Sequence, residues 1–244
     1  MRLTYLFLFV FTFILTQGSY ASNQKTSAKT TALIERFFKE VGGKKALEEL
    51  KTVERAGEIE FPDHGQIAPN GKGTYKAALI YPNKVHIQIS VGKYIFDELK
   101  IDNEYFEFHY GNFRLVTDDT IKKQLDESSL KANRELLFWQ KEHQDIALVE
   151  KKPKWAKNND CVGGTREKVI ELICFDKKSH LLTAAGSEAE YRIYSDWKLI
   201  ENIKFPMKLT HYKAGVISYE IKLNTFIINQ IISAADFEKP KNLK

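Results

Sequence analysis

Six histidines are the first candidates for chemistry in this chain: His64, His86, His109, His143, His180 and His211. None lies in an HExxH or HxH pattern, and none is near a cysteine or an acid at the spacing of zinc ligands. His86 and His109 fall on the polar side of alternating patterns, where a side chain faces water. We therefore expect ordinary surface histidines and no metal site.

Other catalytic patterns are also missing from the sequence. No serine lies in a GxSxG motif. Residues 71–74 (Gly-Lys-Gly-Thr) resemble part of a phosphate loop, but the spacing fails and they predict a hairpin turn at the start of a strand. The acidic stretch of Asp97, Glu98, Asp102, Glu104 and Glu107 indicates a solvated hairpin face rather than paired catalytic carboxylates or a calcium site. We predict a protein that is not an enzyme and needs no cofactor.

An unrecognised hydrolase is the alternative to that prediction. It would require acids and a histidine to gather at one rim of a barrel, for instance His109 near Asp118 and Asp119.

The N-terminus predicts export. Arg2 precedes an uncharged, largely apolar run from Leu3 to Leu15, and Ser19-Tyr20-Ala21 offers small residues for cleavage after Ala21. Residues 1–21 are therefore a predicted signal peptide, with an uncleaved anchor as the alternative. No cysteine follows the cleavage point, so we expect no attached lipid. The mature chain, residues 22–244, is expected to form one domain with a net charge of +4, which does not indicate nucleic-acid binding.

Two cysteines, Cys161 and Cys174, lie close together in the sequence. An oxidising compartment favours a disulfide between them, and two buried free thiols are the alternative. The basic segment from Lys151 to Lys157 surrounds Trp155. It predicts a loop beside an edge strand, with contact to lipid headgroups as the alternative.

The periodicity of the chain predicts helices first and then strands. Leu33, Phe37, Phe38 and Val41 have helical spacing within residues 27–41, and a short helix is expected at residues 44–51. From Thr52 the period is two, as in antiparallel sheets. A helical insert is expected at residues 119–144, before further strands that end with residues 216–228. The tail from Ala234 is expected to be loose.

These elements predict an α+β fold with an antiparallel sheet of about ten strands. A sheet of that size usually curls or closes, and the N-terminal helices and the insert are the candidates to cover its inner face. The many apolar and aromatic side chains line either a filled core or an apolar cavity.

Several short motifs, in order, resemble the LolA-like family of exported lipoprotein-sorting proteins. They are residues 32–50 (ALIERFFKEVGGKKALEEL), 81–84 (YPNK), 193–197 (IYSDW), 203–206 (IKFP) and 236–240 (DFEKP). The resemblance covers most of the mature chain and implies an incomplete, strongly curved β-barrel whose concave face helices cover. It also implies a cavity for acyl chains. The chain is longer than the compact carrier of that family, and the cysteine pair is not a general family trait.

The resemblance leads us to expect a soluble periplasmic or envelope protein that binds a lipid or an acylated lipoprotein without catalysis. It would contact membranes or other envelope proteins only transiently. The alternative is a regulatory or scaffold protein with a filled core and an exposed apolar patch. The residues expected to face the cavity are Val85, Ile87, Ile89, Phe106, Phe108, Leu137, Phe138, Trp139, Tyr219, Ile221 and Leu223, whose other role would be core packing.

Overall fold

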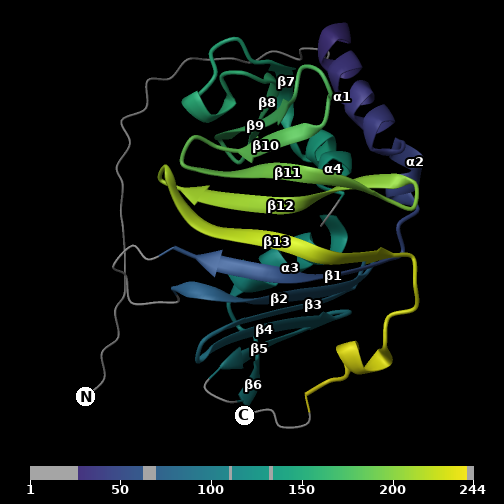
Figure 1. Cartoon of the computed structure of the whole chain (residues 1–244), viewed down its shortest axis with the longest axis vertical. Coiled ribbons are helices and arrows are strands. Elements are labelled where there is room, and N and C mark those ends of the chain that lie inside the picture. Colours follow the sequence, from purple (N-terminus) through teal and green to yellow (C-terminus); the bar gives the residue numbers. More distant parts are fainter. Residues whose placement is uncertain (1–26, 63–69, 110–111, 132–133, 241–244) are drawn as a thin grey trace.

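The computed structural model describes residues 27–62, 70–109, 112–131 and 134–240. The predicted signal peptide lies outside these residues. One 13-stranded antiparallel sheet dominates the fold (Figure 1). The helices are α1 (Ala28–Val41), α2 (Lys44–Glu48), α3 (Asp119–Lys131) and α4 (Glu135–Glu142), with short 3-10 turns η1 (Lys154–Ala156) and η2 (Ala234–Phe237). No helix in the described part of the chain is long and apolar enough to cross a membrane.

The strands follow the chain outward from the centre of the sheet and then return from the other edge. The first six are β1 (Thr52–Phe61), β2 (Gly71–Ile80), β3 (Lys84–Val91), β4 (Tyr94–Ile101), β5 (Glu104–His109) and β6 (Asn112–Leu115). Helices α3 and α4 then carry the chain to the opposite edge. The remaining seven are β7 (Gln144–Leu148), β8 (Asp160–Arg166), β9 (Val169–Phe175), β10 (Leu182–Gly186), β11 (Glu190–Ile200), β12 (Ile203–Lys213) and β13 (Val216–Ile228).

The two halves of the sheet join where β13 pairs with β1. Val53 lies opposite Ile228, and a register shift between Ala56 and Gly57 bends this central pair. The edges are β6 and β7, so the sheet formed by the described residues stays open, as the predicted incomplete barrel requires.

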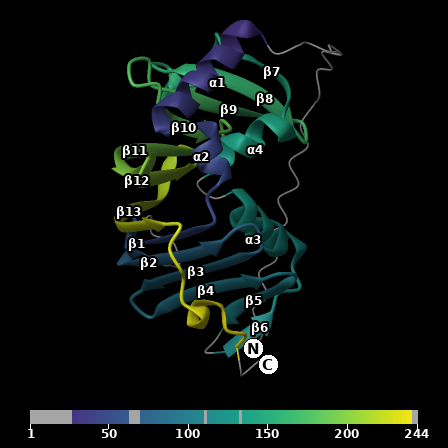
Figure 2. The same cartoon turned by 90° about the vertical axis from the view of Figure 1, so that its right-hand side faces the viewer.

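Helix α1 lies across the strands of the upper half of the sheet. It contacts both β12 and β7, which are five strands apart in the sheet. Strands at about 4.8 Å spacing separate those two by roughly 24 Å, and the 14 residues of α1 span about 21 Å. The helix therefore covers this half of the sheet along its length. Helices α1, α2 and α4 gather on the upper half, and α3 lies against β3 and β4 below (Figure 2).

Sequence signals at both ends of α1 explain its limits. The Ser27 hydroxyl caps the helix by accepting a hydrogen bond from the Thr30 N–H at 3.2 Å. Gly42 ends it with φ 111°, a left-handed conformation that favours glycine. A Cβ on Gly42 would lie 2.1 Å from the carbonyl oxygen of Asn202. Glycine therefore lets the end of α1 rest against the turn between β11 and β12.

The main hydrophobic core lies between the concave face of the sheet and the helices. Leu33, Ile34, Phe37, Phe38 and Val41 of α1 are buried in it, so the predicted helical stripe is confirmed. Two smaller clusters cover other parts of the sheet. One lies under η2, and the other surrounds the cysteine pair.

Two sequence predictions about the fold were wrong. About ten strands were expected, and the described residues form thirteen. The segment of β8 is one that the sequence pattern did not indicate as a strand, because Gly163 and Gly164 weaken the signal. The tail from Ala234 was expected to be loose, yet η2 docks on the sheet. Phe237 is buried there and Asp236 pairs with Lys76 at 3.0 Å. The last four residues lie outside the described part of the chain.

Candidate functional site

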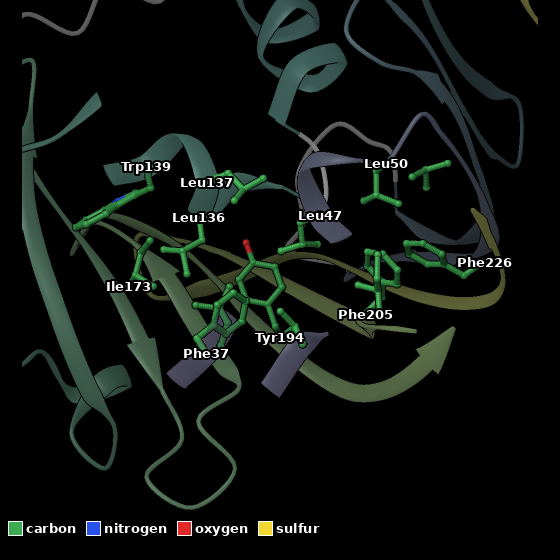
Figure 3. Packing of buried hydrophobic residues seen from close by; sticks show 14 of the residues in the cluster. Phe37, Leu47, Leu50, Leu136, Leu137, Trp139, Ile173, Tyr194, Phe205 and Phe226 are labelled. Atoms are coloured by element: carbon green, nitrogen blue, oxygen red, sulfur yellow. The ribbon is translucent and has the colours of Figure 1, made fainter. Parts of the chain in front are cut away.

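An apolar hollow of about 90 Å³ lies between the concave face and the helical cover. Phe37 and Val41 of α1, Leu47 of α2 and Leu136 of α4 form its helical wall. Figure 3 shows Leu47 and Leu136 approaching Tyr194 of the sheet from the helical side. The sheet contributes mainly apolar and aromatic side chains: Leu182, Tyr194, Trp197, Phe205, Leu209, Ile221 and Leu223.

Polar groups also reach into this hollow. Arg55 of β1 lies over the ring of Tyr75, 5.5 Å from its centroid, and Glu135 extends from the first turn of α4. Burial raises the pKa of the Tyr194 phenol to about 12, even though Arg192 acts in the opposite direction. The hollow is therefore an apolar compartment with a few placed polar groups, as in small-molecule sites.

A second, more polar hollow of about 360 Å³ adjoins the first. At its wall Glu171 accepts a hydrogen bond from Arg166 at 2.9 Å and faces His143 Nε2 at 3.2 Å. The hydrogen bond from His143 and the charge of Arg166 hold the pKa of Glu171 below its ordinary value, although burial opposes them. His143 Nδ1 lies 2.8 Å from the carbonyl oxygen of Trp139 and so ties the end of α4 to β9.

The two hollows lie side by side and share lining residues. Glu135, Leu136, Leu182 and Tyr194 belong to both. The apolar walls thus continue into the polar ones at the start of α4.

Nine of the eleven residues predicted for the cavity line a hollow or belong to the main core. Ile221 and Leu223 line the apolar hollow, and Trp139 lines the polar one. Val85 and Leu137 are buried in the main core, while Ile87, Ile89, Phe138 and Tyr219 pack against it. The structure thus brings nine of these residues to the concave side.

Phe106 and Phe108 are the exceptions, and the expectation that they face inward was wrong. Phe106 is buried in the cluster formed with Leu99, Ile101 and Phe237 on the other face. Phe108 has the same strand parity and stacks edge-on with Phe113 at 5.4 Å. In β5, Tyr105 and Phe106 are both aromatic but point to opposite faces of the sheet, so the sequence pattern does not show which face is inward. Segment η2 covers the face that carries Phe106.

The expectation of plain surface histidines also needs correction. His143 and His211 are buried. His211 Nε2 lies 2.9 Å from Glu190, and His86 Nε2 lies 2.7 Å from Asp97. Asp97 is thus partly enclosed rather than fully solvated. The strand alternation places a side chain on one face, but only the fold decides whether that face is covered.

Of the residues named for a hydrolase site, Asp118 has a structural role. Asp118 caps α3 by accepting hydrogen bonds from the N–H groups of Thr120 at 2.7 Å and Ile121 at 3.2 Å. These bonds lower its pKa. The side chain of His109 lies outside the described part, and within that part no cluster of three metal-ligating side chains occurs.

The predicted disulfide is confirmed. Cys161 of β8 and Cys174 of β9 are direct partners in the antiparallel register and are bonded to each other. Trp155, in the basic loop after edge strand β7, stacks on Tyr191 at 4.7 Å. Its ring packs on the protein instead of projecting from the loop.

Sequence reasoning missed the charged residues of the concave face, chiefly Arg55, Glu135 and Arg192. A signal was present in the strands, because Arg55 and Arg192 share strand parity with the buried residues Val53 and Tyr194. A charge in phase with the apolar face is unusual, and it marks a polar group inside the compartment.

No family model matches this sequence, and no curated protein matches it. Solved structures with the same architecture exist. A LolA superfamily protein from Nitrosomonas europaea is 11% identical with a TM-score of 0.52, covering 86% of this chain and 97% of that one. A DUF1329 family protein from Desulfovibrio piger gives 9% identity, a TM-score of 0.52 and coverages of 86% and 97%.

A putative outer membrane lipoprotein-sorting protein domain from Vibrio parahaemolyticus is 9% identical with a TM-score of 0.52, covering 85% of this chain and 97% of that domain. At such identities the likeness concerns the fold alone. The chain therefore has the open, curved, helix-covered fold of the LolA superfamily protein and the lipoprotein-sorting domain.

Proposed function

We propose that this protein is an exported envelope protein that holds the acyl chains of a lipid or an acylated lipoprotein. The observation that carries the proposal is the apolar hollow between the concave face and the cover formed by α1, α2 and α4. Two structural neighbours, the LolA superfamily protein and the putative outer membrane lipoprotein-sorting domain, support it by analogy of fold. Binding needs no catalytic group.

The energetics of acyl-chain binding agree with a reversible role. Burying one CH₂ group contributes about 0.8 kcal/mol, so a sixteen-carbon chain contributes on the order of 10 kcal/mol before costs. The apolar hollow, at about 90 Å³, is below the range of roughly 300–1,000 Å³ of ordinary ligand sites. Uptake must therefore displace part of the helical cover, and that cost offsets some of the affinity and favours release.

The test is native mass spectrometry of protein purified from the envelope, together with uptake of an acyl-chain fluorophore. Leu223→Gln places a polar amide in the apolar wall and should weaken uptake about tenfold or more, because the amide loses water without a partner. Leu199→Gln is the matched control, since Leu199 is 63% exposed. An empty protein that takes up no fluorophore would overturn the proposal.

The second candidate function is a scaffold that binds another envelope protein. The observation in its favour is the exposed run Tyr94, Ile95 and Phe96, at the start of β4 next to the β3–β4 turn. Pull-down of a defined partner that Phe96→Ser abolishes, together with an empty hollow, would favour this function over lipid binding.

A further inference from the structure

His143, the residue at the end of α4, lies between two hydrogen-bond acceptors. Its Nδ1 is 2.8 Å from the carbonyl oxygen of Trp139, and its Nε2 is 3.2 Å from a carboxylate oxygen of Glu171. The carbonyl has no hydrogen to donate. The hydrogen bond from His143 and the charge of Arg166 hold the pKa of Glu171 below its ordinary value, so its carboxyl group is ionised and has none either. Both ring nitrogens of His143 therefore face groups that only accept.

Only the protonated ring of His143 can satisfy both acceptors. A neutral imidazole carries one N–H group, so it donates to one neighbour and turns a lone pair toward the other. The end of a helix also favours a cation, because its last carbonyl groups carry negative partial charge. His143 is buried, so water does not readily replace a lost partner.

The charged groups around His143 come from four elements and are mostly acidic. Arg166 of β8 lies 2.9 Å from Glu171 of β9, 3.5 Å from Glu127 of α3 and 3.6 Å from Glu142 of α4. Three carboxylates thus share one guanidinium, and the formal charge of the group is −2 with neutral His143 and −1 with protonated His143. The proton on His143 reduces the repulsion among the carboxylates.

The other buried histidine of the polar hollow has different surroundings. His211 Nε2 lies 2.9 Å from Glu190, and its Nδ1 has no hydrogen-bond partner in the described part of the chain. Burial lowers the pKa of His211, and the charges of Arg192 and Lys213 act in the same direction. One N–H group is enough here, so neutral His211 keeps its bond, whereas neutral His143 loses one.

Helix α4 is the part of the wall that depends on His143. Glu135 and Leu136 line both hollows, and Trp139 lines the polar one with its ring stacked on that of His143 at 4.3 Å. The contacts of His143 with Glu171 and of Glu142 with Arg166 tie the end of this helix to β9 and β8. If that end moves away from the sheet, the polar hollow widens beside the apolar one.

We propose that protonation of His143 controls how firmly α4 is held to the sheet, and therefore how fast a bound acyl chain exchanges. The proposal rests on the proposed function and adds regulation to it. Histidine ordinarily changes charge between pH 5 and pH 8. Both hydrogen bonds are present on the acidic side of that range, and one is lost as the pH rises.

Hydrogen–deuterium exchange of the mature protein without ligand measures the release of α4. Protection factors, corrected for the intrinsic exchange rate, are compared for the amides of α4 and α1 from about pH 5.5 to about pH 9. A hydrogen bond to a charged group corresponds to about 10- to 100-fold in an equilibrium constant, so protection of α4 should fall about tenfold or more as the pH rises. Helix α1 contains no histidine, and its protection should stay constant.

Glu171→Gln is the sharpest variant, because the two carboxylate oxygens contact different groups. One faces His143 and the other accepts from Arg166. The amide of glutamine can donate to Nε2 and still accept from Arg166, so neutral His143 satisfies both neighbours and protection of α4 should no longer depend on pH. His143→Gln should also abolish the dependence. His211→Gln is the matched control and should keep it, and thermal melting checks that each variant is folded.

The second measurement is the dissociation rate of N-phenyl-1-naphthylamine, a fluorescent probe that is neutral over this pH range. The rate should rise about tenfold or more with pH in the parent and stay constant in Glu171→Gln. If the probe binds at no pH, the proposed function is wrong and the regulation falls with it. A dissociation rate that does not change with pH, a change that persists in Glu171→Gln, or an equal loss of protection in α1 overturns the inference and leaves lipid binding intact.

Discussion

The packing of α4 on β8 depends on Gly164, and Gly164→Ala tests it most sharply. A Cβ at this position would lie 2.7 Å from Cβ of His143 and 3.1 Å from Cη2 of Trp139. The first contact is between rigid atoms close to the backbone, so no side-chain rotation relieves it. The end of α4 must move away from the sheet.

The expected loss of stability follows from this geometry. Overpacking by one methyl group costs about 1–3 kcal/mol. In a domain of this size each kcal/mol lowers Tm by about 2–4 °C, which gives a decrease of roughly 2–12 °C. The shift should also lengthen the 3.2 Å contact between His143 and Glu171 and expose Trp139, which is 7% exposed in the native protein.

The assay combines thermal melting with tryptophan emission, because a wetter Trp139 emits at longer wavelength. Thr165→Ala changes the next residue of the same strand, whose side chain points to the other face, and serves as the control. An unchanged Tm and emission spectrum in Gly164→Ala would show that α4 does not lie against β8 as closely as the structure places it.

Three further predictions concern the disulfide and two titrating groups. Replacing Cys161 and Cys174 with serine should lower the free energy of unfolding by about 3 kcal/mol in urea titration, since the bond closes a short loop; an unchanged midpoint would contradict this. The pKa of Glu171 is depressed, so its contribution to stability is present above the ordinary value of 4.5 and is lost as pH falls through the folded value. Urea midpoints measured from pH 6 to pH 3 should therefore drop less in Glu171→Gln than in the parent, and parallel curves would refute the role of this carboxylate. The pKa of Tyr194 is raised to about 12, so the folded protein loses stability as pH rises from about 10, the ordinary value, to 12. Tyrosinate absorbance in Tyr194→Phe should lack one late-titrating group, and an identical titration curve would count against its burial.

Local patterns predicted the helices and most strands because their causes are local. The stripe of Leu33, Phe37 and Val41 and the glycine that follows it specify α1 regardless of the rest of the chain. Strand β8 escaped prediction for a tertiary reason. Val149 and His143 approach Gly163 and Gly164 so closely that a larger side chain would not fit there. The alternating pattern of a strand carries no information about such contacts.

The candidate site was only partly predictable. Alternation placed Ile221 and Leu223 on one face and the residues between them on the other, and the fold puts this face toward the hollow. The same reasoning failed for Phe106. Segment η2 covers the outer face of β5, so an apolar side chain can be buried on that face as well. Arg55 and Arg192 lie in phase with the apolar face, and their electrostatic interaction with Glu135 arises only because the fold places α4 beside these strands.

By itself, the sequence determined the helices and most strands in their order, the single possible cysteine pairing and the presence of an apolar face on each alternating strand. The elements and their apolar faces depend on residues near one another in the chain, and two cysteines allow only one pairing. The tertiary structure alone decided which face is concave and which residues line the hollows. These depend on the pairing of β1 with β13 and on the position of α4, which join residues far apart in the sequence. Periodicity divides each strand into two faces, but only packing decides which of them faces the compartment.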